Sequence, residues 1–189
     1  PREQVKTTLE SAPVHKAVNT FDPNTSTPFE HVQGDVSYLD ALAQIFEIYQ
    51  PRSYLEIGVR QGKSLALSNC PSVGVDPDPA IAVQLPAHAR VVSQTSDVFF
   101  ETKSDAILDQ PVDLTFIDGM HLFEFALRDF MNAEQASSAD GVIIIDDVLP
   151  NHPAQATRDR KTRVWTGDVW KLIPVLDKYR PDLTLPLLE

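Results

Sequence analysis

Short apolar runs alternate along the chain with longer segments in which apolar residues recur at helical spacing. The apolar runs predict five strands, at residues 53–58, 72–76, 89–94, 112–118 and 141–147. The helical spacing predicts helices over residues 36–49, 62–69, 79–85, 96–104, 122–136 and 166–176. Strands that alternate with helices form parallel sheets through right-handed crossovers. The pattern therefore predicts an α/β fold: a doubly wound, mostly parallel sheet with helices on both faces.

The two ends of the chain differ from this alternating pattern. Residues 1–34 are polar and punctuated by proline, so we interpret them as an N-terminal arm or cover. A single domain is then expected over residues 35–189. Residues 181–189 would begin a sixth strand. Within the domain, segment 141–147 is almost wholly apolar, which is typical of a strand with both faces covered by helices.

Charge and composition exclude several classes of protein. A formal net charge of −11 argues against nucleic acid as the main partner, because binding it requires a broad basic surface. No apolar stretch is long enough to span a membrane, and the N-terminus lacks the pattern of a signal peptide. The single cysteine, Cys70, fits a reducing compartment. We therefore expect a cytoplasmic protein with small-molecule partners, and the sequence leaves a homodimer open.

The stretch LEIGVRQGKSLAL follows the first predicted strand, where parallel sheets bind ligands. Gly58 and Gly62 would let the backbone approach a ligand closely, and Ser64 lies at the start of the next predicted helix. A ligand-free turn is the alternative. Asp76, at the end of the second strand, is 18 residues beyond Gly58, a distance typical of a carboxylate that binds ribose hydroxyls. Glu56 would repel a pyrophosphate, which favours a cationic, amino-bearing cofactor over a dinucleotide.

With these features in place, the chain resembles class I S-adenosylmethionine-dependent methyltransferases. TFIDGMHLFEFALRDF, followed by DGVIIIDDVLP, is similar to the small-molecule O-methyltransferases related to macrocin O-methyltransferase, and more distantly to the catechol type. The resemblance covers about residues 36–150. These enzymes usually carry a seventh, antiparallel strand that we cannot find here, so we expect an abbreviated sheet or a truncated chain.

The resemblance implies roles for the residues of the glycine stretch and beyond. Residues that would bind S-adenosylmethionine are Glu56, Gly58, Gly62 and Ser64 near its methionine part, Asp76 at its ribose, Ser96 and Asp97 at its adenine, and Asp118. For Asp97 the alternative is an acid that stabilises the first turn of a helix, which explains the residue equally well.

Three carboxylates follow the fourth and fifth predicted strands. Asp118 ends one strand, and Asp146 with Asp147 end the other. If these strands are parallel neighbours, the three side chains converge, and such groups repel one another unless a cation intervenes. Oxygen ligands suit Mg²⁺ or another divalent cation, which could lower the pKa of a substrate hydroxyl. The alternative is that these carboxylates cap helices or face solvent. Adjacent strand residues point to opposite faces, so Asp146 and Asp147 can both bind a cation only if the chain turns directly after the strand.

His121 is the candidate general base, with Asp118 as its catalytic partner. Some relatives have an aspartate two places after the first one, and this chain has Met120 there. The base role would then fall to His121 or to the ligated carboxylates. The alternative is a polar surface histidine.

A basic run lies beyond the fifth strand, at Arg158, Arg160, Lys161 and Arg163, with Trp165 after it. In this fold the loop lies over the substrate pocket, so the run favours an anionic substrate. A solvated helix face is the simpler account.

Together these observations predict an enzyme that transfers a methyl group from S-adenosylmethionine to a small-molecule acceptor, expected to be a hydroxyl oxygen, with metal assistance left open. One alternative is an NAD-dependent oxidoreductase on the same architecture. The other is a module that binds S-adenosylmethionine without catalysis. The identity of the acceptor does not follow from the sequence.

Overall fold

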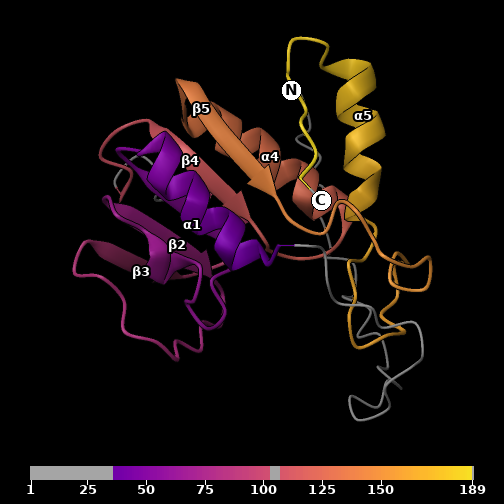
Figure 1. Ribbon diagram of the computed structural model, residues 1–189, viewed down its shortest axis with the longest axis horizontal. Helices are drawn as coiled ribbons and strands as arrows, with labels where there is room; N and C mark the ends of the chain where they lie inside the picture. The colour runs from indigo at the N-terminus through magenta and orange to yellow at the C-terminus, as the bar shows by residue number, and fades with distance from the viewer. Residues whose placement is uncertain (1–35, 103–106, 189) are drawn as a thin grey trace, which may run out of the picture.

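The computed structural model describes residues 36–102 and 107–188 and contains one parallel sheet. Its strands lie in the order β3-β2-β1-β4-β5, and every neighbouring pair is parallel (Figure 1). The strands are β1 Tyr54–Ile57, β2 Ser72–Asp76, β3 Ala89–Ser93, β4 Val112–Ile117 and β5 Ser137–Ile145. All five predicted strands are therefore confirmed, and their carboxyl ends meet at one edge of the sheet.

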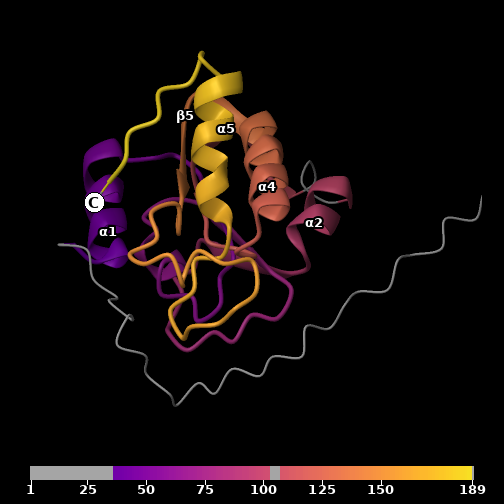
Figure 2. The same cartoon turned by 90° about the vertical axis from the view of Figure 1, so that its right-hand side faces the viewer.

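Helices cover both faces of this sheet. Helix α1 (Tyr38–Tyr49) lies on one face, whereas α2 (Ser96–Thr102), α4 (Phe123–Ala136) and α5 (Leu172–Tyr179) lie on the other (Figure 2). Three apolar cores hold the layers together: one joins α1 to β1 and β4, another joins β1 and β4 to α4 and α5, and the third joins β1, β2 and β4 to α2. The doubly wound α/β fold is confirmed, and β1 and β4 are buried along their full lengths.

Local sequence sets the bounds of α1. The Ser37 hydroxyl accepts the backbone N–H of Asp40 at the first turn, and Gln50 ends the helix in a left-handed conformation just before Pro51. On the inner face, Leu42 and Phe46 are buried against the sheet. The predicted arm at residues 1–34 lies outside the described residues.

Two predicted helices are wrong. Segment 62–69 forms only a short 3₁₀ helix, Leu65–Leu67, and 79–85 forms no helix. Residues 79–85 instead bond to the loop after β1: Ala80 N–H donates to the Arg60 carbonyl and Ala82 N–H to the Gln61 carbonyl. These tertiary bonds fold 79–85 against the glycine turn.

The C-terminal third also differs from the prediction. The predicted helix 166–176 is divided into a 3₁₀ turn, Val169–Lys171, and α5, and residues 181–188 form no strand. β5 begins at Ser137, earlier than predicted, and within the described residues it pairs only with β4. It is therefore an edge strand whose residues are partly buried or exposed. Ile144 packs on the α1 side, and Ile143 and Ile145 pack on the side of α4 and α5, so helices cover both faces of the strand as expected. None of the helices in the described ranges has the length and apolarity needed to cross a membrane.

Candidate active site

The turn after β1 brings the carboxyl ends of three strands together. Gly58 has φ +90° and donates its N–H to the Val75 carbonyl of β2. A Cβ atom at Gly58 would lie 2.0 Å from the carbonyl oxygen of Asp118, which follows β4. Only glycine allows this approach, because a side chain would collide with backbone and strain a positive φ. Gly62, at φ +78°, forms the other end of the turn.

Glu56 lies beneath this turn with no exposed surface. The hydroxyl of Ser64 donates to one carboxyl oxygen and the hydroxyl of Tyr54 to the other, each at 2.7 Å. Burial raises the pKa of Glu56 to about 7, although both hydroxyl hydrogen bonds oppose that change. Glu56 therefore holds the Ser64 hydroxyl in place. Because Glu56 has no exposed surface, it could influence a bound ligand only through Ser64 and through the charge of its own carboxyl group.

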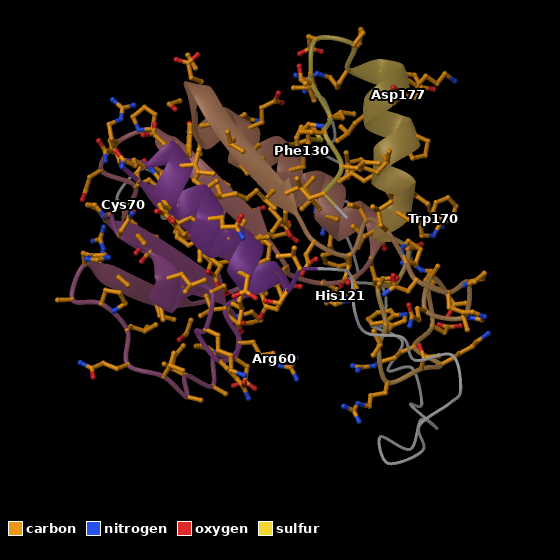
Figure 3. The ribbon with its side chains drawn as sticks, in the orientation of Figure 1. Arg60, Cys70, His121, Phe130, Trp170 and Asp177 are labelled. Atoms are coloured by element: carbon orange, nitrogen blue, oxygen red, sulfur yellow. The ribbon has the colours of Figure 1, made fainter. Side chains whose placement is uncertain are left out.

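Asp76 ends β2 on the open side of the same turn. One of its carboxylate oxygens accepts the Arg60 backbone N–H at 2.7 Å, and the other accepts the Asp78 N–H at 2.8 Å. These two bonds fix the carboxylate while leaving it partly exposed. Arg60, with φ +46°, projects from this loop at the same edge of the sheet (Figure 3). Asp76 is therefore placed where a ligand in the turn could reach it.

Ser96 and Asp97 begin α2 beyond β3. The Asp97 carboxylate accepts two hydrogen bonds from the Arg128 guanidinium, both at 2.9 Å, and so joins α2 to α4. Asp97 also lies in the first turn of α2, as the simpler interpretation expects. Its contact with adenine remains a prediction, as does that of Ser96.

The parallel register places the acidic residues side by side, as expected. Ile117 pairs with Ile145, so Asp118 and Asp146 follow the two strands at the same level. The chain turns at once after Asp146, because Asp147 takes the left-handed conformation at φ +62°. Ligand atoms of Asp118, His121 and Asp147 consequently lie within 4.8 Å of one another. Asp146 is adjacent to this triad and accepts the Asp147 N–H instead.

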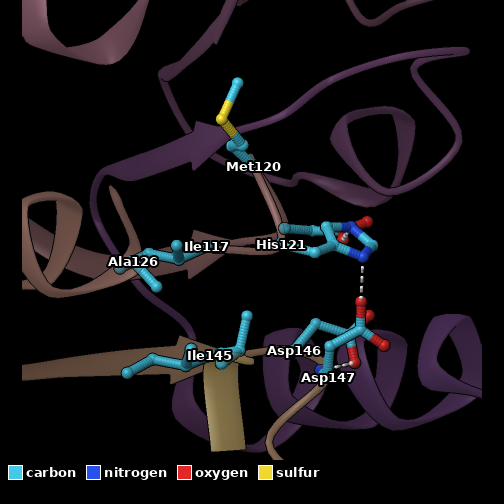
Figure 4. A pocket seen from close by; sticks show the side chains of 10 residues that line it. Ile117, Met120, His121, Ala126, Ile145, Asp146 and Asp147 are labelled. Carbon is cyan, nitrogen blue, oxygen red and sulfur yellow. Dashed lines mark hydrogen bonds and ion pairs between the residues drawn. The ribbon is translucent and has the colours of Figure 1, made fainter. Parts of the chain in front are cut away.

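His121 lies between two carboxylates (Figure 4). Its Nδ1 is 2.8 Å from Asp147 Oδ2, and its Nε2 is 3.5 Å from Asp118 Oδ1. Burial lowers the pKa of His121, but the bonds to Asp118 and Asp147 outweigh it and raise the pKa to about 10. Burial, and after it the neighbouring carboxylates Asp118 and Asp147, raise the pKa of Asp146 to about 7. The negative charge of Asp118 and Asp147 therefore stabilises the protonated, cationic form of His121. The same carboxylates could stabilise another bound cation.

The floor of this pocket is apolar, and its rim is polar. Ile117, Ala126, Ile145 and Val169 line it below the acidic residues. Met120 points away from His121 in Figure 4, so it supplies no group to the triad.

The segment after β5 encloses His121 from the other side. The His121 ring stacks on the Trp165 indole with 5.4 Å between centroids and 16° between planes. Its Nδ1 also lies 2.7 Å from the Trp165 carbonyl oxygen. The sequence predicts Trp165 near the substrate but gives no sign of its contact with His121, because 44 residues separate the two.

The basic run is not a helix face. Arg158 pairs with Glu124 and Asp168, and the Arg160 guanidinium donates to the carbonyls of Thr162 and Arg163. Arg158 and Arg160 therefore stabilise the loop itself. The exposed side chains of Lys161 and Arg163 lie beside them.

Comparisons with known proteins agree with this geometry. A family model described as a methyltransferase domain matches residues 55–148, which include the glycine turn, Asp76 and the acidic triad. Residues 55–148 form a methyltransferase domain. The match spans β1 to the turn after β5, so the site of this methyltransferase lies almost wholly within it. Comparison with curated proteins finds no match.

Solved structures share the fold of this methyltransferase at low identity. A cofactor-bound protein from MTB is 17% identical, with a TM-score of 0.59 over 81% of this chain and 73% of its own. A putative caffeoyl-CoA O-methyltransferase from Staphylococcus aureus is 19% identical, with a TM-score of 0.56 over 80% and 78%. The O-methyltransferase TomG from Streptomyces achromogenes, in complex with SAM (S-adenosylmethionine), is 18% identical, with a TM-score of 0.55 over 76% and 70%.

Proposed function

We propose that this methyltransferase transfers the methyl group of S-adenosylmethionine to an oxygen of a small molecule. The observation that carries the proposal is the convergence of Asp118, His121 and Asp147 beside the glycine turn, because it places an acidic, base-bearing site next to the loop that follows β1. The S-adenosylmethionine in the Streptomyces achromogenes O-methyltransferase supports the choice of cofactor. The O-methyltransferase names of two structural neighbours support an oxygen acceptor.

The cofactor would lie along the carboxyl edge of β1, β2 and β4. Gly58 and Gly62, both at positive φ, shape the turn that would border its methionine part, and Ser64 offers a hydroxyl hydrogen-bonded to Glu56. Asp76 would accept the ribose hydroxyls, since two backbone N–H groups already orient its carboxylate. Ser96 and Asp97 would border the adenine, with Asp97 held by Arg128.

The acidic triad fits a hard divalent cation. Asp118 and Asp147 offer carboxylate oxygens, and Asp146 adds negative charge from beside them. Carboxylates suit Mg²⁺ and Mn²⁺. Nδ1 of His121 is bound to the Trp165 carbonyl, which leaves its Nε2 for the role of base. A bound cation would supply Lewis acidity that lowers the pKa of an acceptor hydroxyl.

His121 would take the proton from that hydroxyl as a general base. It must be neutral to do so, and its contacts with Asp118 and Asp147 favour the charged form. Much of the rate would come from holding the acceptor oxygen in line with the methyl group and excluding water. Trp165 would provide an aromatic wall, and Lys161 with Arg163 would attract an acceptor that carries negative charge.

Calorimetry with S-adenosylmethionine and with NAD tests the cofactor. We expect binding of S-adenosylmethionine that is lost in Asp76→Ala, and no binding of NAD. Binding of NAD alone would favour the oxidoreductase alternative and contradict the proposal.

Turnover assays test the chemistry. Phenols, sugar hydroxyls and carboxylic acids would be assayed as acceptors with Mg²⁺, Mn²⁺ or EDTA, using Asp118→Asn, His121→Asn and, as an exposed control, Glu47→Gln. Activity that EDTA and Asp118→Asn leave unchanged would refute the metal site. Tight cofactor binding without any transfer would favour the non-catalytic module.

A further inference from the structure

Residues Trp165–Asp168, which we call the clasp, contact His121 at three points. The Trp165 indole covers the imidazole ring, and the Trp165 carbonyl accepts from Nδ1. The backbone N–H of Asp168 donates to the His121 carbonyl at 3.2 Å. Between them, Gly167 has φ +60° and passes so near that a Cβ atom there would lie 1.6 Å from the His121 carbonyl oxygen. Both the ring and the backbone of His121 are thus held by a segment distant in sequence.

Asp168 also anchors the beginning of α4. Leu122, at the N-cap position of that helix, has no side chain that can cap it. The Asp168 carboxylate fills this role from 45 residues away, because its Oδ1 accepts the Phe123 backbone N–H at 2.7 Å. A carboxylate at a helix N-terminus satisfies a free N–H and complements the helix dipole. His121 lies two residues before this anchored N–H, so the capping bond limits its movement.

Two cations hold the Asp168 carboxylate in place. Its Oδ2 lies 2.8 Å from Lys171 Nζ and 3.3 Å from Arg158 Nη1, and the side chain is only 2% exposed. Arg158 also pairs with Glu124 in the first turn of α4. Burial of this carboxylate is therefore compensated on every side, and its position is fixed relative to α4 and to the loop.

We infer that Asp168 is a positioning residue, which sets His121 toward Asp118 and Asp147 by capping α4 and closing the clasp. The inference rests on the proposed role of His121 as base, but the placement of the ring can be measured without activity. None of the hydrogen bonds and ion pairs of Asp168 given above involves Asp118 or Asp147. Its effect on the reaction must therefore pass through His121.

The experiment compares Asp168→Ala, Asp168→Asn and the control Glu134→Ala. Glu134 pairs with Arg180 at the opposite end of α4, so its loss also weakens the attachment of that helix without touching His121. Asparagine retains an oxygen that can accept the Phe123 N–H. All variants would be assayed well below their unfolding temperatures, with folding checked by circular dichroism.

Two measurements decide the inference. The first is kcat and KM, for which Asp168→Ala is expected to lower kcat about 10- to 100-fold while Asp168→Asn and Glu134→Ala stay within about threefold. The second is the ring-current shift that Trp165 imposes on the His121 ring protons, read by NMR with His121→Asn for assignment. We expect that shift to collapse only in Asp168→Ala.

The inference is overturned if Asp168→Ala keeps the His121 shift and wild-type kcat, or if Glu134→Ala loses as much of either. Absence of methyl transfer in the wild-type protein would refute the proposed function alone, because the NMR shift would still report whether Asp168 holds His121 in place.

Discussion

Glu56 is an ionisable residue that is completely buried. The stability of the site therefore depends on whether this one carboxyl group is charged. Its two oxygens each accept a hydroxyl, yet burial dominates and raises the pKa to about 7. Folding therefore favours the protonated acid between the unfolded pKa, near 4.5, and about 7. A positive charge on a bound cofactor would reverse that preference.

Because the pKa of Glu56 rises on folding, its contribution to the free energy of unfolding is fully present below pH 4.5 and is lost as pH rises through about 7. A shift of this size corresponds to about 3 kcal/mol. Glu56→Gln should remove that part of the pH dependence, measured by urea unfolding between pH 4.5 and 8. Glu47→Gln, on the exposed side of α1, is the control. A Glu56→Gln profile parallel to the wild type would contradict the prediction.

Because Gly58 has no side chain, the chain after β1 can lie against the chain after β4 at the site. Gly58→Ala should destabilise the protein by about 2–4 kcal/mol, because the new Cβ meets the Asp118 backbone and φ is positive. It should also abolish binding of S-adenosylmethionine in calorimetry.

Gly141→Ala, in β5, is the matched control for Gly58→Ala. Its Cβ would make tight contacts of 3.0–3.1 Å with Ser137 Cβ and with the carbonyl oxygens of Ser138 and Val112, but its φ is not positive. Cofactor binding should survive this change. Equal loss of binding in both variants would show that Gly58 acts only through general stability.

At the scale of elements, α4 is held mainly by its apolar face. Phe130 and Ala133 are buried against Ile117 and the residues of α5, whereas the Arg180–Glu134 ion pair is about one-third exposed on both sides. Burial of apolar area stabilises a packed helix far more than a solvent-screened ion pair does.

Phe130→Ala should therefore lower the free energy of unfolding by about 3–5 kcal/mol. Arg180→Gln should lower it by no more than about 1 kcal/mol, although it removes bonds to both Glu134 and Asp182. Urea denaturation midpoints of the two variants test the difference. Similar losses in both would mean that the ion pair, and not the apolar face, attaches α4.

The whole molecule places its site on one edge of one sheet, formed by loops that follow β1, β2, β4 and β5. A ligand that binds this edge connects four strand ends and stabilises the native state by mass action. The clasp adds a contribution from beyond β5, outside the matched methyltransferase domain.

S-adenosylmethionine at about 100 times its Kd should stabilise the protein by about 2.7 kcal/mol. For a chain of this size that corresponds to a rise in Tm of roughly 5–10 °C in thermal unfolding. NAD should leave Tm unchanged, and Asp76→Ala should abolish the rise. A rise with NAD, or none with S-adenosylmethionine, would contradict the proposed cofactor.

The sequence by itself determined the strands, the main helices and the edge on which the acidic residues lie. Apolar runs such as VDLTFI and VIII can be buried only as strands between helices, and parallel neighbours with a fixed register must bring Asp118 and Asp146 to the same level. Local pattern was misleading at 62–69, which forms only short-range turns, and at 79–85, which bonds to the carbonyls of Arg60 and Gln61 without forming a helix.

Only the tertiary structure decided which residues meet at the site. The left-handed turn at Asp147, and not its place in a strand, directs its carboxylate toward His121. Asp168 caps α4 from 45 residues away, and no periodicity in the sequence signals a contact between segments so far apart. Strands and helices follow from interactions between near neighbours in the chain, whereas the partners of His121 depend on how the finished elements pack.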